Sequence, residues 1–370
     1  MRTFGTQGPV NSKENYVVSR TEEIADFVDR VKKGKYIVLF APRQTGKTTF
    51  FRAAMDALIA KEYFPIQLNF EPYIDLTPTT FYGYLLKEIY EKIESVFRTR
   101  GTELPENLKH LLTGVELIDH VSMRNFFRQL ADFLPYKIVL VIDEFDAIPP
   151  DAVRGFLHSL RYIYLDNSDF RCPYSVGIVG VKNITQLNYD RSISPFNIQD
   201  EFHLPNFTLA QVGELLEQYT NEVGQAFAPE VIAAIHKQTA GQPFLVNRCA
   251  QILTEELGVP KNEPITMAHF SKAHTQLLEE QNLNTEYLLT NIRRDPRFES
   301  LLMRIISYER GVRFNIDNEI INELVTYGVI TKSANRMCKI ANPIYQHHIQ
   351  QNIKPLPSKP QVRIRDTLLH

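Results

Sequence analysis

A polar stretch that follows a short apolar run near the start of the chain has the residue types of a phosphate-binding loop. Residues 36–40 read YIVLF, and residues 41–49 read APRQTGKTT. This order matches the pattern G-x-x-x-x-G-K-[ST], with alanine at the first position. The backbone N–H groups of such a loop, with the positive end of the helix that follows, surround phosphate oxygens. The stretch therefore predicts a cradle for a triphosphate where a strand gives way to a helix.

The pattern assigns a different role to each of several residues in this stretch. In the pattern, Lys47 reaches the β- and γ-phosphates and the hydroxyl of Thr48 ligates Mg²⁺. Alanine at position 41 resists backbone angles that glycine permits, and an ordinary strand–helix turn that contains Gly-Lys-Thr is the alternative interpretation. The strand pattern before the stretch and the helical pattern after it favour the phosphate loop. The nucleotide contacts that it predicts come from Ala41, Pro42, Arg43, Gln44, Thr45, Gly46, Lys47, Thr48 and Thr49.

A pair of acids further along the chain supplies the second chemical signal. Residues 137–146 read KIVLVIDEFD, an apolar run with β-branched residues that ends in acids and predicts a buried strand. Asp143 can hold the Mg²⁺ shell, and Glu144 can polarise the water that attacks a γ-phosphate. A solvated acidic loop after a strand is the alternative. Because parallel α/β folds bring strand ends together, the acids and the phosphate loop predict one site.

Three weaker candidates complete the predicted site. Asn183 follows the strand-like run at 174–181, where it could contact the γ-phosphate or the attacking water, or simply belong to a strand-end loop. Arg191 could act as an arginine finger or sensor, or be an ordinary surface arginine. Pro243, in the turn AGQPF, can open a helix and could also lie near an adenine ring. The predicted catalytic residues are Lys47, Glu144, Asn183 and Arg191, and the predicted metal ligands are Thr48 and Asp143.

Alternation of apolar runs and helical periodicity indicates the fold class. Strands are expected at 36–40, 65–70, 137–146, 174–181 and 201–207, and helices near 21–33, 47–61, 79–98 and 122–134. Strands separated by helices predict an α/β domain with a mainly parallel sheet. The pattern then becomes helical, with helices expected at 208–222, 228–239, 243–256, 268–280 and 283–293. A final unit from 298 onward predicts helix, helix, strand, hairpin, strand and short helix.

Composition limits the alternatives. A chain of 370 residues predicts about two or three domains. The formal net charge of −2 gives no global attraction to nucleic acid or to an anionic membrane. The cysteines Cys172, Cys249 and Cys338 are widely spaced, which favours a reduced, cytoplasmic protein. No stretch approaches the roughly 18 apolar residues of a membrane helix, and the N-terminus lacks an apolar signal core. The adjacent His347 and His348 do not share a helix face, so they make a poor metal site.

Several short stretches together resemble a known family. They are similar to the motifs of AAA-like P-loop ATPases of the STAND kind (signal transduction ATPases with numerous domains), including bacterial AAA-like domain proteins and archaeal-type ATPases. The matching stretches are YVVSRTEEI, APRQTGKTT, VLVIDEFD, SPFNI, GQPFLV and ANPIYQHHI. The resemblance extends over about residues 16–350. It implies ATP and Mg²⁺ as cofactors, places Arg20 near the adenine and Pro243 over the base, and makes residues 329–341 the wing of a winged helix.

The resemblance also implies a domain order. It predicts a P-loop ATPase core of the α/β type at 16–207 and a helical lid at 208–294, which come after a flexible N-terminal arm that the residues themselves indicate at 1–15. A winged-helix domain at 295–350 and a flexible tail at 351–370 follow. Members often carry further repeat or effector regions after the winged helix, and this sequence stops soon after it, so a signalling role would need a partner chain or self-assembly.

Three functions are compatible with these features. The first is a slow ATPase that acts as a nucleotide-dependent switch or assembly factor, with ATP and ADP as ligands and a homo-oligomer or a separate effector protein as partner. The second is ATP-regulated DNA binding through the winged helix; basic residues there favour it, whereas Asp317, Glu319 and Glu323 in the expected recognition helix would repel phosphate. The third is a scaffold that binds nucleotide for stability only.

Overall fold

The computed structural model describes residues 1–59, 62–166, 171–181, 198–307 and 311–353. The chain forms two compact units, Met1–His274 and a second one that begins at Thr275. None of the described helices combines the length and the apolar composition that are needed to cross a membrane. Within the described ranges, all three cysteines are buried and free, and no cluster of three or more His, Cys, Asp or Glu side chains suits a metal ion.

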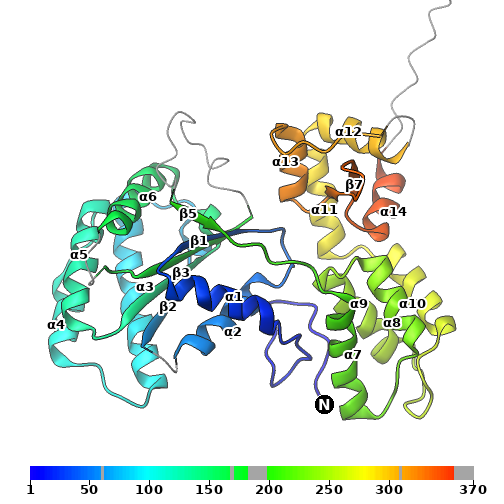
Figure 1. Ribbon diagram of the computed structural model, residues 1–370, viewed down its shortest axis with the longest axis horizontal. Coiled ribbons are helices and arrows are strands. Elements are labelled where there is room, and N and C mark those ends of the chain that lie inside the picture. The colour runs from blue at the N-terminus through cyan, green and yellow to red at the C-terminus, as the bar shows by residue number, and fades with distance from the viewer. Residues whose placement is uncertain (60–61, 167–170, 182–197, 308–310, 354–370) are drawn as a thin grey trace, which may run out of the picture. The chain divides into compact units, whose positions relative to one another are not determined.

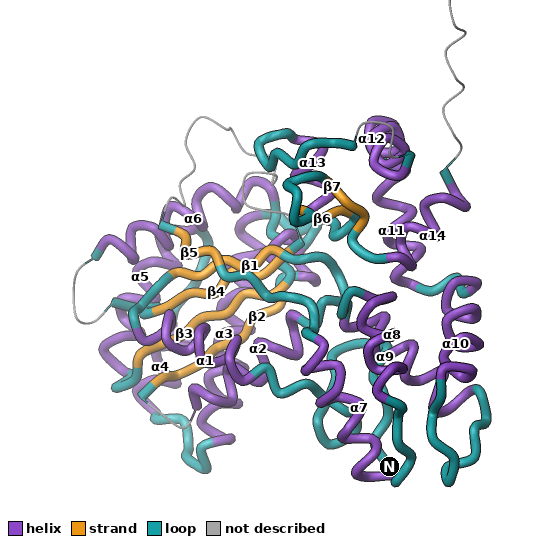
Figure 2. Tube along the Cα trace, turned by 45° about the vertical axis from the view of Figure 1, so that its right-hand side comes forward, coloured by secondary structure: helices purple, strands orange, loops and turns teal. Residues whose placement is uncertain are grey.

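The centre of the first unit is a five-stranded sheet in which every neighbouring pair is parallel. Its strands run in the order β2-β3-β4-β1-β5, and Figure 2 shows them side by side. The bounds are β1 (Tyr36–Phe40), β2 (Tyr63–Asn69), β3 (Lys137–Asp143), β4 (Ser175–Gly180) and β5 (Gln199–Glu201). The prediction of an α/β domain built on a parallel sheet is confirmed.

The strand register brings the two chemical motifs to one edge of the sheet. Phe40, the last residue of β1, pairs with Gly180 at the end of β4. On its other side β4 pairs with β3, so the ends of β1 and β3 flank the end of β4. The loop after β1 and the acids after β3 therefore leave the same edge of the sheet, as expected for the ligand-binding edge of an α/β fold.

Helices cover both faces of the sheet (Figure 1). One face packs against α1 (Thr21–Lys32) and α2 (Lys47–Ile59), whose Phe27, Phe50 and Phe51 form an aromatic cluster with Phe202. The other face packs against α3 (Pro78–Thr99), α4 (Glu106–Gly114), α5 (His120–Phe133) and α6 (Pro150–Leu165). Short 3-10 turns, η1 (Glu71–Tyr73) and η2 (Phe145–Ala147), follow β2 and β3. Coverage on both sides explains why the strands are nearly continuous apolar runs.

Some expected elements differ from the observed ones. Of the strand that we expected at 201–207, only Glu201 lies in a strand, because the fifth strand is Gln199–Glu201. Phe202 still donates its N–H to the carbonyl of Val38 on β1 at 2.9 Å. Pro205 has no N–H group for a ladder, which disfavours a strand further along, and Phe202, Leu204 and Phe207 are all buried. Helices α4 and α6 were not expected. Helix α6 begins at Pro150, a position in the first helical turn where proline is well tolerated.

Helices α7 (Leu209–Val223), α8 (Pro229–Thr239) and α9 (Pro243–Gln251) follow the sheet, and we call them the lid helices. Thr208 caps α7 in a capping box with Gln211, and Gly224, with φ of 85°, ends that helix. After α9 the chain continues as a π-helical turn at Ile252–Glu256, and α10 (Met267–Glu279) comes next. These helices begin and end close to the expected positions.

Residues 1–15, which we expected to form a flexible arm, make specific contacts in the first unit. Phe4 is 2% exposed, and its ring centroid lies 4.9 Å from that of Tyr16 and 5.7 Å from that of Tyr219 on α7. Arg2 pairs with Glu222 at 2.9 Å. The arm is therefore attached to the first lid helix by an aromatic cluster and an ion pair.

The second unit contains α11 (Leu283–Arg293), α12 (Pro296–Ile306), α13 (Glu319–Thr326), β6 (Ile330–Lys332), β7 (Cys338–Ile340) and α14 (Pro343–Asn352). From α12 onward, it has the order of elements that the sequence predicted for the final unit, whereas we expected the first of its helices, α11, within the helical lid at 208–294. Strands β6 and β7 pair as an antiparallel hairpin. The interpretation of these elements as a winged helix stays a prediction.

Candidate nucleotide-binding site

The phosphate loop, residues 41–49, runs from the end of β1 into the first turn of α2. Its turn depends on positive φ angles at Gln44 (61°) and Gly46 (82°). Ala41 continues the sheet instead, because its N–H donates to the carbonyl of Gly180 at 3.2 Å. Alanine is thus tolerated at this position, since the left-handed conformation that would require glycine lies further along the loop. Thr45 Oγ1 donates to the carbonyl of Pro42 at 2.9 Å and braces the loop from within.

Lys47 is a buried cation at the start of α2. Its side chain is 6% exposed, and Nζ donates to the carbonyls of Ala41 and Pro42 at 2.8 Å each. Burial lowers the pKa of Lys47, whereas the nearby carboxylates of Glu144 and Asp143 raise it. The ammonium group is therefore held inside the loop, next to two acids, where it can exchange carbonyl partners for phosphate oxygens.

Thr48 and Asp143 meet at the junction of α2 and β3. Thr48 Oγ1 donates to Asp143 Oδ2 at 2.8 Å, and Asp143 is 5% exposed. The second carboxylate oxygen of Asp143 accepts the backbone N–H of Glu144 at 3.0 Å. A hydroxyl and a carboxylate oxygen at this separation are the hard oxygen donors that Mg²⁺ prefers, and Mg²⁺ sites next to phosphates usually use few protein ligands. The donor set fits the predicted metal.

Glu144 leaves β3 in an unusual backbone conformation. Its φ and ψ are 50° and 43°, in the left-handed region that non-glycine residues rarely adopt. Burial raises the pKa of Glu144; Lys47 opposes this effect, and Asp143 adds to it. A higher pKa makes the carboxylate a stronger proton acceptor, and a strained residue of this kind is common at functional sites.

Asp146 ties the acidic loop to the neighbouring strand, a function that the sequence did not reveal. Its Oδ2 accepts the backbone N–H of Val181 at 2.7 Å, just beyond the end of β4. A Cβ atom on Gly180 would lie 2.7 Å from Asp146 Oδ1, so glycine leaves room for this carboxylate. Asn183 and Arg191, which follow on the same segment, lie outside the described residues, and their predicted functions stay predictions.

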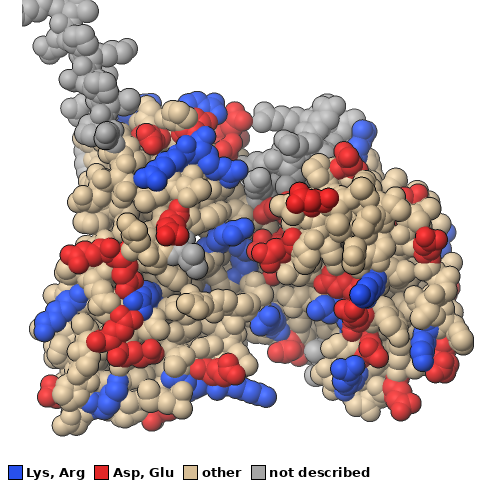
Figure 3. All heavy atoms as spheres, turned by 180° about the vertical axis from the view of Figure 1, so that it is seen from behind, with Lys and Arg blue, Asp and Glu red and all other residues tan. Residues whose placement is uncertain are grey.

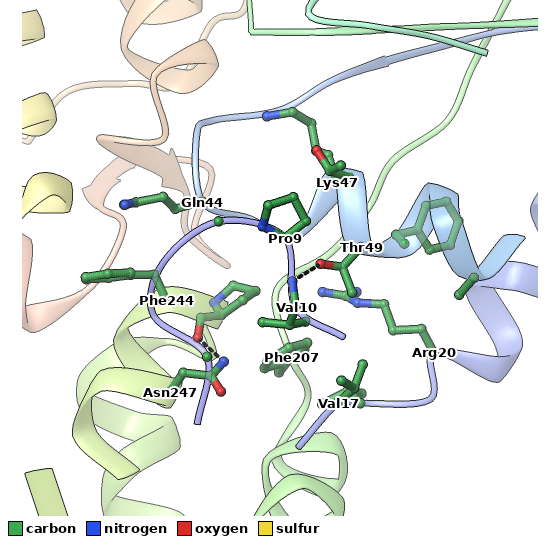
Figure 4. Close-up of a pocket in the computed structure, with 18 of the residues that line it drawn as sticks. Pro9, Val10, Val17, Arg20, Gln44, Lys47, Thr49, Phe207, Phe244 and Asn247 are labelled. Atoms are coloured by element: carbon green, nitrogen blue, oxygen red, sulfur yellow. Dashed lines mark hydrogen bonds between the residues drawn. The ribbon is translucent and has the colours of Figure 1, made fainter. Parts of the chain in front are cut away.

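A cavity of about 330 Å³ opens beside the phosphate loop (Figure 4). Its walls come from the arm, from the core and from the lid helices. Val10 of the arm donates its N–H to Thr49 Oγ1 at 3.4 Å, which places the arm against the first turn of α2. Many of the lining side chains are apolar, as is typical of pockets for small molecules. They include Val10, Val17, Val18, Ile24, Phe207, Leu215, Pro243 and Phe244.

Most residues predicted from the sequence gather around this one cavity. Arg20, Arg43, Gln44, Gly46, Lys47, Thr48, Thr49, Glu144 and Pro243 all line it. Asp143 is connected to it through Thr48. Ala41, Pro42 and Thr45 do not line the cavity and instead hold the loop through backbone and side-chain hydrogen bonds. The structure thus brings the loop, the acids and the lid turn together, while the role of each residue stays a prediction.

Comparison with known proteins establishes the family. The sequence model of the AAA-like domain family matches residues 6–351. The chain belongs to the AAA-like domain family. It is therefore a P-loop ATPase of the AAA-like kind, and membership implies binding of ATP with Mg²⁺ and ATP hydrolysis as general properties of the family.

One solved structure has a similar fold, and two further proteins show weaker similarity. The Walker-type ATPase PABY2304 of Pyrococcus abyssi superposes with a TM-score of 0.64 at 15% identity, covering 94% of this chain and 99% of that one. The RuvB Holliday junction branch migration motor of Thermotoga maritima gives a TM-score of 0.43 at 15% identity, covering 89% and 93%. An uncharacterized WD repeat-containing protein of Synechocystis, slr0143, is 24% identical over 247 residues, 65% of this chain. The chain spans 20% of the length of that relative.

Arg20, which the family resemblance placed near the adenine, lies in the wall of the cavity. It is 5% exposed, its Nη1 donates to the carbonyl of Pro205 at 2.8 Å, and its guanidinium stacks 4.7 Å above the ring of Phe207. Burial lowers the pKa of Arg20, and Glu23 raises it. Nη2 is buried without a hydrogen-bond partner among the described residues. This orphaned donor suits a cavity that takes a ligand with acceptor atoms.

Sequence reasoning missed several residues of the AAA-like site. Phe244 and Asn247 on α9 line the cavity beside Pro243, and the Asn247 amide donates to the Pro243 carbonyl at 2.8 Å. Asn247 Oδ1 is buried without a partner among the described residues. The turn GQPF was a usable signal for Phe244, whereas nothing in the sequence pointed to Val10 in the arm.

Proposed function

We propose that this AAA-like ATPase is an ATP-dependent molecular switch that hydrolyses ATP slowly to ADP and phosphate. The observation that carries the proposal is the composition of one cavity, which is bounded by the phosphate loop, the arm and the lid helix α9. A ligand that contacts three separate segments can change their relative stability when the ligand changes. Switches of this kind use the γ-phosphate as the feature that distinguishes the two states.

The core residues would bind and orient the nucleotide. Lys47 would exchange the carbonyls of Ala41 and Pro42 for phosphate oxygens, which its buried position between the acids favours. Thr48 and Asp143 would hold the metal, directly or through water. ATP with Mg²⁺ supplies the phosphoanhydride bond and the neutralisation of its charge. These residues keep the phosphates in place but leave the proton transfer to another group.

Glu144 would accept the proton from the attacking water. The carboxylate is close enough to Lys47 and Asp143 to feel both charges, and its raised pKa suits a general base. Its left-handed backbone, which follows directly on β3, is the kind of strained conformation found at functional sites. Asn183 and Arg191 remain candidates for contacts to the γ-phosphate, and Arg191 could complete the site of the same chain or that of a second copy.

The switch needs a recipient for its signal. We propose either a second copy of the chain or a separate effector protein. Size-exclusion chromatography with light scattering on the wild type and on Glu144→Gln, with and without ATP and Mg²⁺, separates the two. The variant is expected to retain ATP, because it binds the nucleotide but lacks the base. Larger particles with ATP support self-assembly, and monomers that retain ATP point to an effector; failure of the wild type to bind ATP would contradict the switch itself.

The structure gives less support for DNA binding. In the second unit, α13 begins at Glu319 and also contains Glu323, whose pKa is raised by burial and by Glu319. An acidic helix would repel the phosphates of a duplex. On the face shown in Figure 3, basic and acidic side chains are interspersed among the described residues instead of forming a broad basic area. The remaining alternative is a scaffold that binds nucleotide for stability only. The Glu144→Gln experiment tests it as well, because a scaffold would retain unhydrolysed ATP in the wild type and in the variant alike.

A further inference from the structure

Gln242 connects a lid helix to the phosphate loop through a single side chain. It lies between Gly241 and Pro243 and is 5% exposed. Its Oε1 accepts the backbone N–H of Leu245 at 2.7 Å and so caps α9. Its Nε2 donates to the backbone carbonyl of Gln44 at 3.2 Å. The first turn of α9 and the central turn of the phosphate loop are therefore joined by one amide group.

The amide can satisfy both neighbours in only one orientation. Leu245 offers an N–H donor and Gln44 offers a carbonyl acceptor. If the amide oxygen and nitrogen of Gln242 were exchanged, its NH₂ group would face the N–H of Leu245 and its oxygen would face the carbonyl of Gln44, and neither pair can form a hydrogen bond. The contact with Gln44 is thus a defined hydrogen bond that depends on the direction of one carbonyl group.

Both ends of the connection are held by their own backbone. The segment before Gln242 approaches the core so closely that a Cβ atom on Gly241 would lie 1.9 Å from the carbonyl oxygen of Phe207. Phe207 in turn donates its N–H to the Gly241 carbonyl at 2.8 Å. At the other end, Gln44 has φ of 61°, so the direction of its carbonyl depends on the turn of the loop. A change in either backbone breaks the hydrogen bond.

We propose that Gln242 is a positioning residue that transmits the conformation of the phosphate loop to the lid helices. This inference rests on the proposed switch. Lys47 is bonded to the carbonyls of Ala41 and Pro42 in the same loop, and it must release them to bind phosphate. The loop can then reorient its carbonyls, including that of Gln44, and the start of α9 gains or loses its anchor accordingly.

Two substitutions separate this connection from the helix cap. Gln242→Ser keeps a preferred capping residue at the start of α9, but its side chain is too short to reach Gln44. Thr208→Ala is the matched control, because it removes the cap at the start of α7, where Thr208 accepts from Gln211 at 3.2 Å, and does not touch the loop. Gln242→Met, which is similar in length and lacks both hydrogen bonds, provides a second test if the serine variant folds poorly.

The readouts are hydrogen exchange of the lid helices with and without ATP and Mg²⁺, and the rate at which a fluorescent ADP analogue dissociates. We expect the wild type to show nucleotide-dependent protection of α8 and α9. Gln242→Ser should lose most of that dependence and release the analogue about three- to tenfold faster, the range for loss of one hydrogen bond. Thr208→Ala should lower the protection of α7 equally with and without nucleotide, and should leave the nucleotide-dependent protection of α8 and α9 in place.

Other outcomes would overturn the inference. If Gln242→Ser and Gln242→Met both keep the wild-type difference in protection, Gln242 does not transmit the state of the loop. The same conclusion holds if Thr208→Ala abolishes that difference as strongly as Gln242→Ser. If the wild type itself fails to bind the analogue or ATP, the proposed function fails first, which distinguishes the two results.

Discussion

The two sides of the cavity beside the phosphate loop are built from different kinds of residue. On the core side, Lys47 and Asp143 are charged, almost fully buried and tied by hydrogen bonds within the loop and between β3 and α2. On the side of the arm and the lid helices, the wall is mostly apolar, and its polar links to the loop and to α2 include Gln242–Gln44 and Val10–Thr49. The core side therefore supplies the fixed charges that catalysis needs. The arm and the lid helices can move more easily, because fewer polar contacts to the loop and to α2 have to break.

The largest effect should come from the core side. Lys47→Ala removes the buried ammonium group that the loop holds for phosphate, so we expect ATP hydrolysis to fall by on the order of 100-fold or more. ATP affinity, measured by calorimetry, should fall with it. Lys33→Ala is the matched control, because Lys33 is an exposed lysine that pairs with Asp29 at the end of α1, away from the cavity lining. Normal ATP binding by Lys47→Ala would refute the assignment of the phosphate site.

Glu144→Gln should separate hydrolysis from binding. We expect the hydrolysis rate to fall by roughly 100- to 10,000-fold while ATP still binds, because only the proton acceptor is lost. In the wild type, the rate at saturating ATP should rise as pH increases through the pKa of Glu144, since the base works only when deprotonated. That pKa is raised above its usual value of 4.5, so the acidic limb should lie at higher pH than for an ordinary glutamate. A pH–rate profile with no such limb would remove Glu144 from this role.

Gly241→Ala tests the joint between the two sides. The added Cβ would meet the Phe207 carbonyl at 1.9 Å, and φ of 69° is already unfavourable for alanine. We expect a loss of about 2–4 kcal/mol in the free energy of unfolding from strain and overpacking combined. Gly224→Ala is the control: its φ is 85°, but nothing lies within 4 Å of its added Cβ, so it should cost only about 1–2 kcal/mol. Equal losses in urea titrations would show that the close approach is unimportant.

Phe4→Ala should have the smallest effect on the fold and a selective effect on the arm. Phe4 packs on Tyr16 and Tyr219, and its removal frees the arm from α7. We expect limited proteolysis to cut within residues 1–15 more rapidly, while the unfolding of the core, followed by circular dichroism, changes little. ATP affinity should decrease a few-fold, because the arm supplies part of the cavity wall. An unchanged cleavage rate would mean that other contacts hold the arm.

The same division explains what could be predicted from the sequence. The core side is encoded locally: APRQTGKTT and VLVIDEFD each name their own chemistry, and the alternating pattern predicts the parallel sheet that brings them together. The other side depends on contacts between segments that are far apart in the chain. Val10 and Thr49 are hydrogen-bonded although 39 positions separate them in the sequence, and Gln242 and Gln44 are hydrogen-bonded across 198 positions. No local periodicity carries such information.

Errors in the predicted elements have similar causes. The strand expected at 201–207 was inferred from buried apolar residues, although β5 ends at Glu201 and Pro205 offers no N–H group for a ladder. Asp146 looked like one more solvated acid in the sequence, and only the neighbouring end of β4 shows that it fixes the acidic loop. In both cases a correct reading of residue type was not sufficient, because the partner of the residue lies on another element.

The position of Phe244 is suited to a fluorescent reporter in the cavity wall. The chain contains no tryptophan, and Phe244 lies in the wall that α9 contributes to the cavity, 8% exposed. Phe244→Trp would therefore introduce a single indole at the apolar side of the site, and its emission could be recorded without background from other tryptophans. If the lid helices move as the proposed switch requires, that movement would then become visible in real time, in the unlabelled protein.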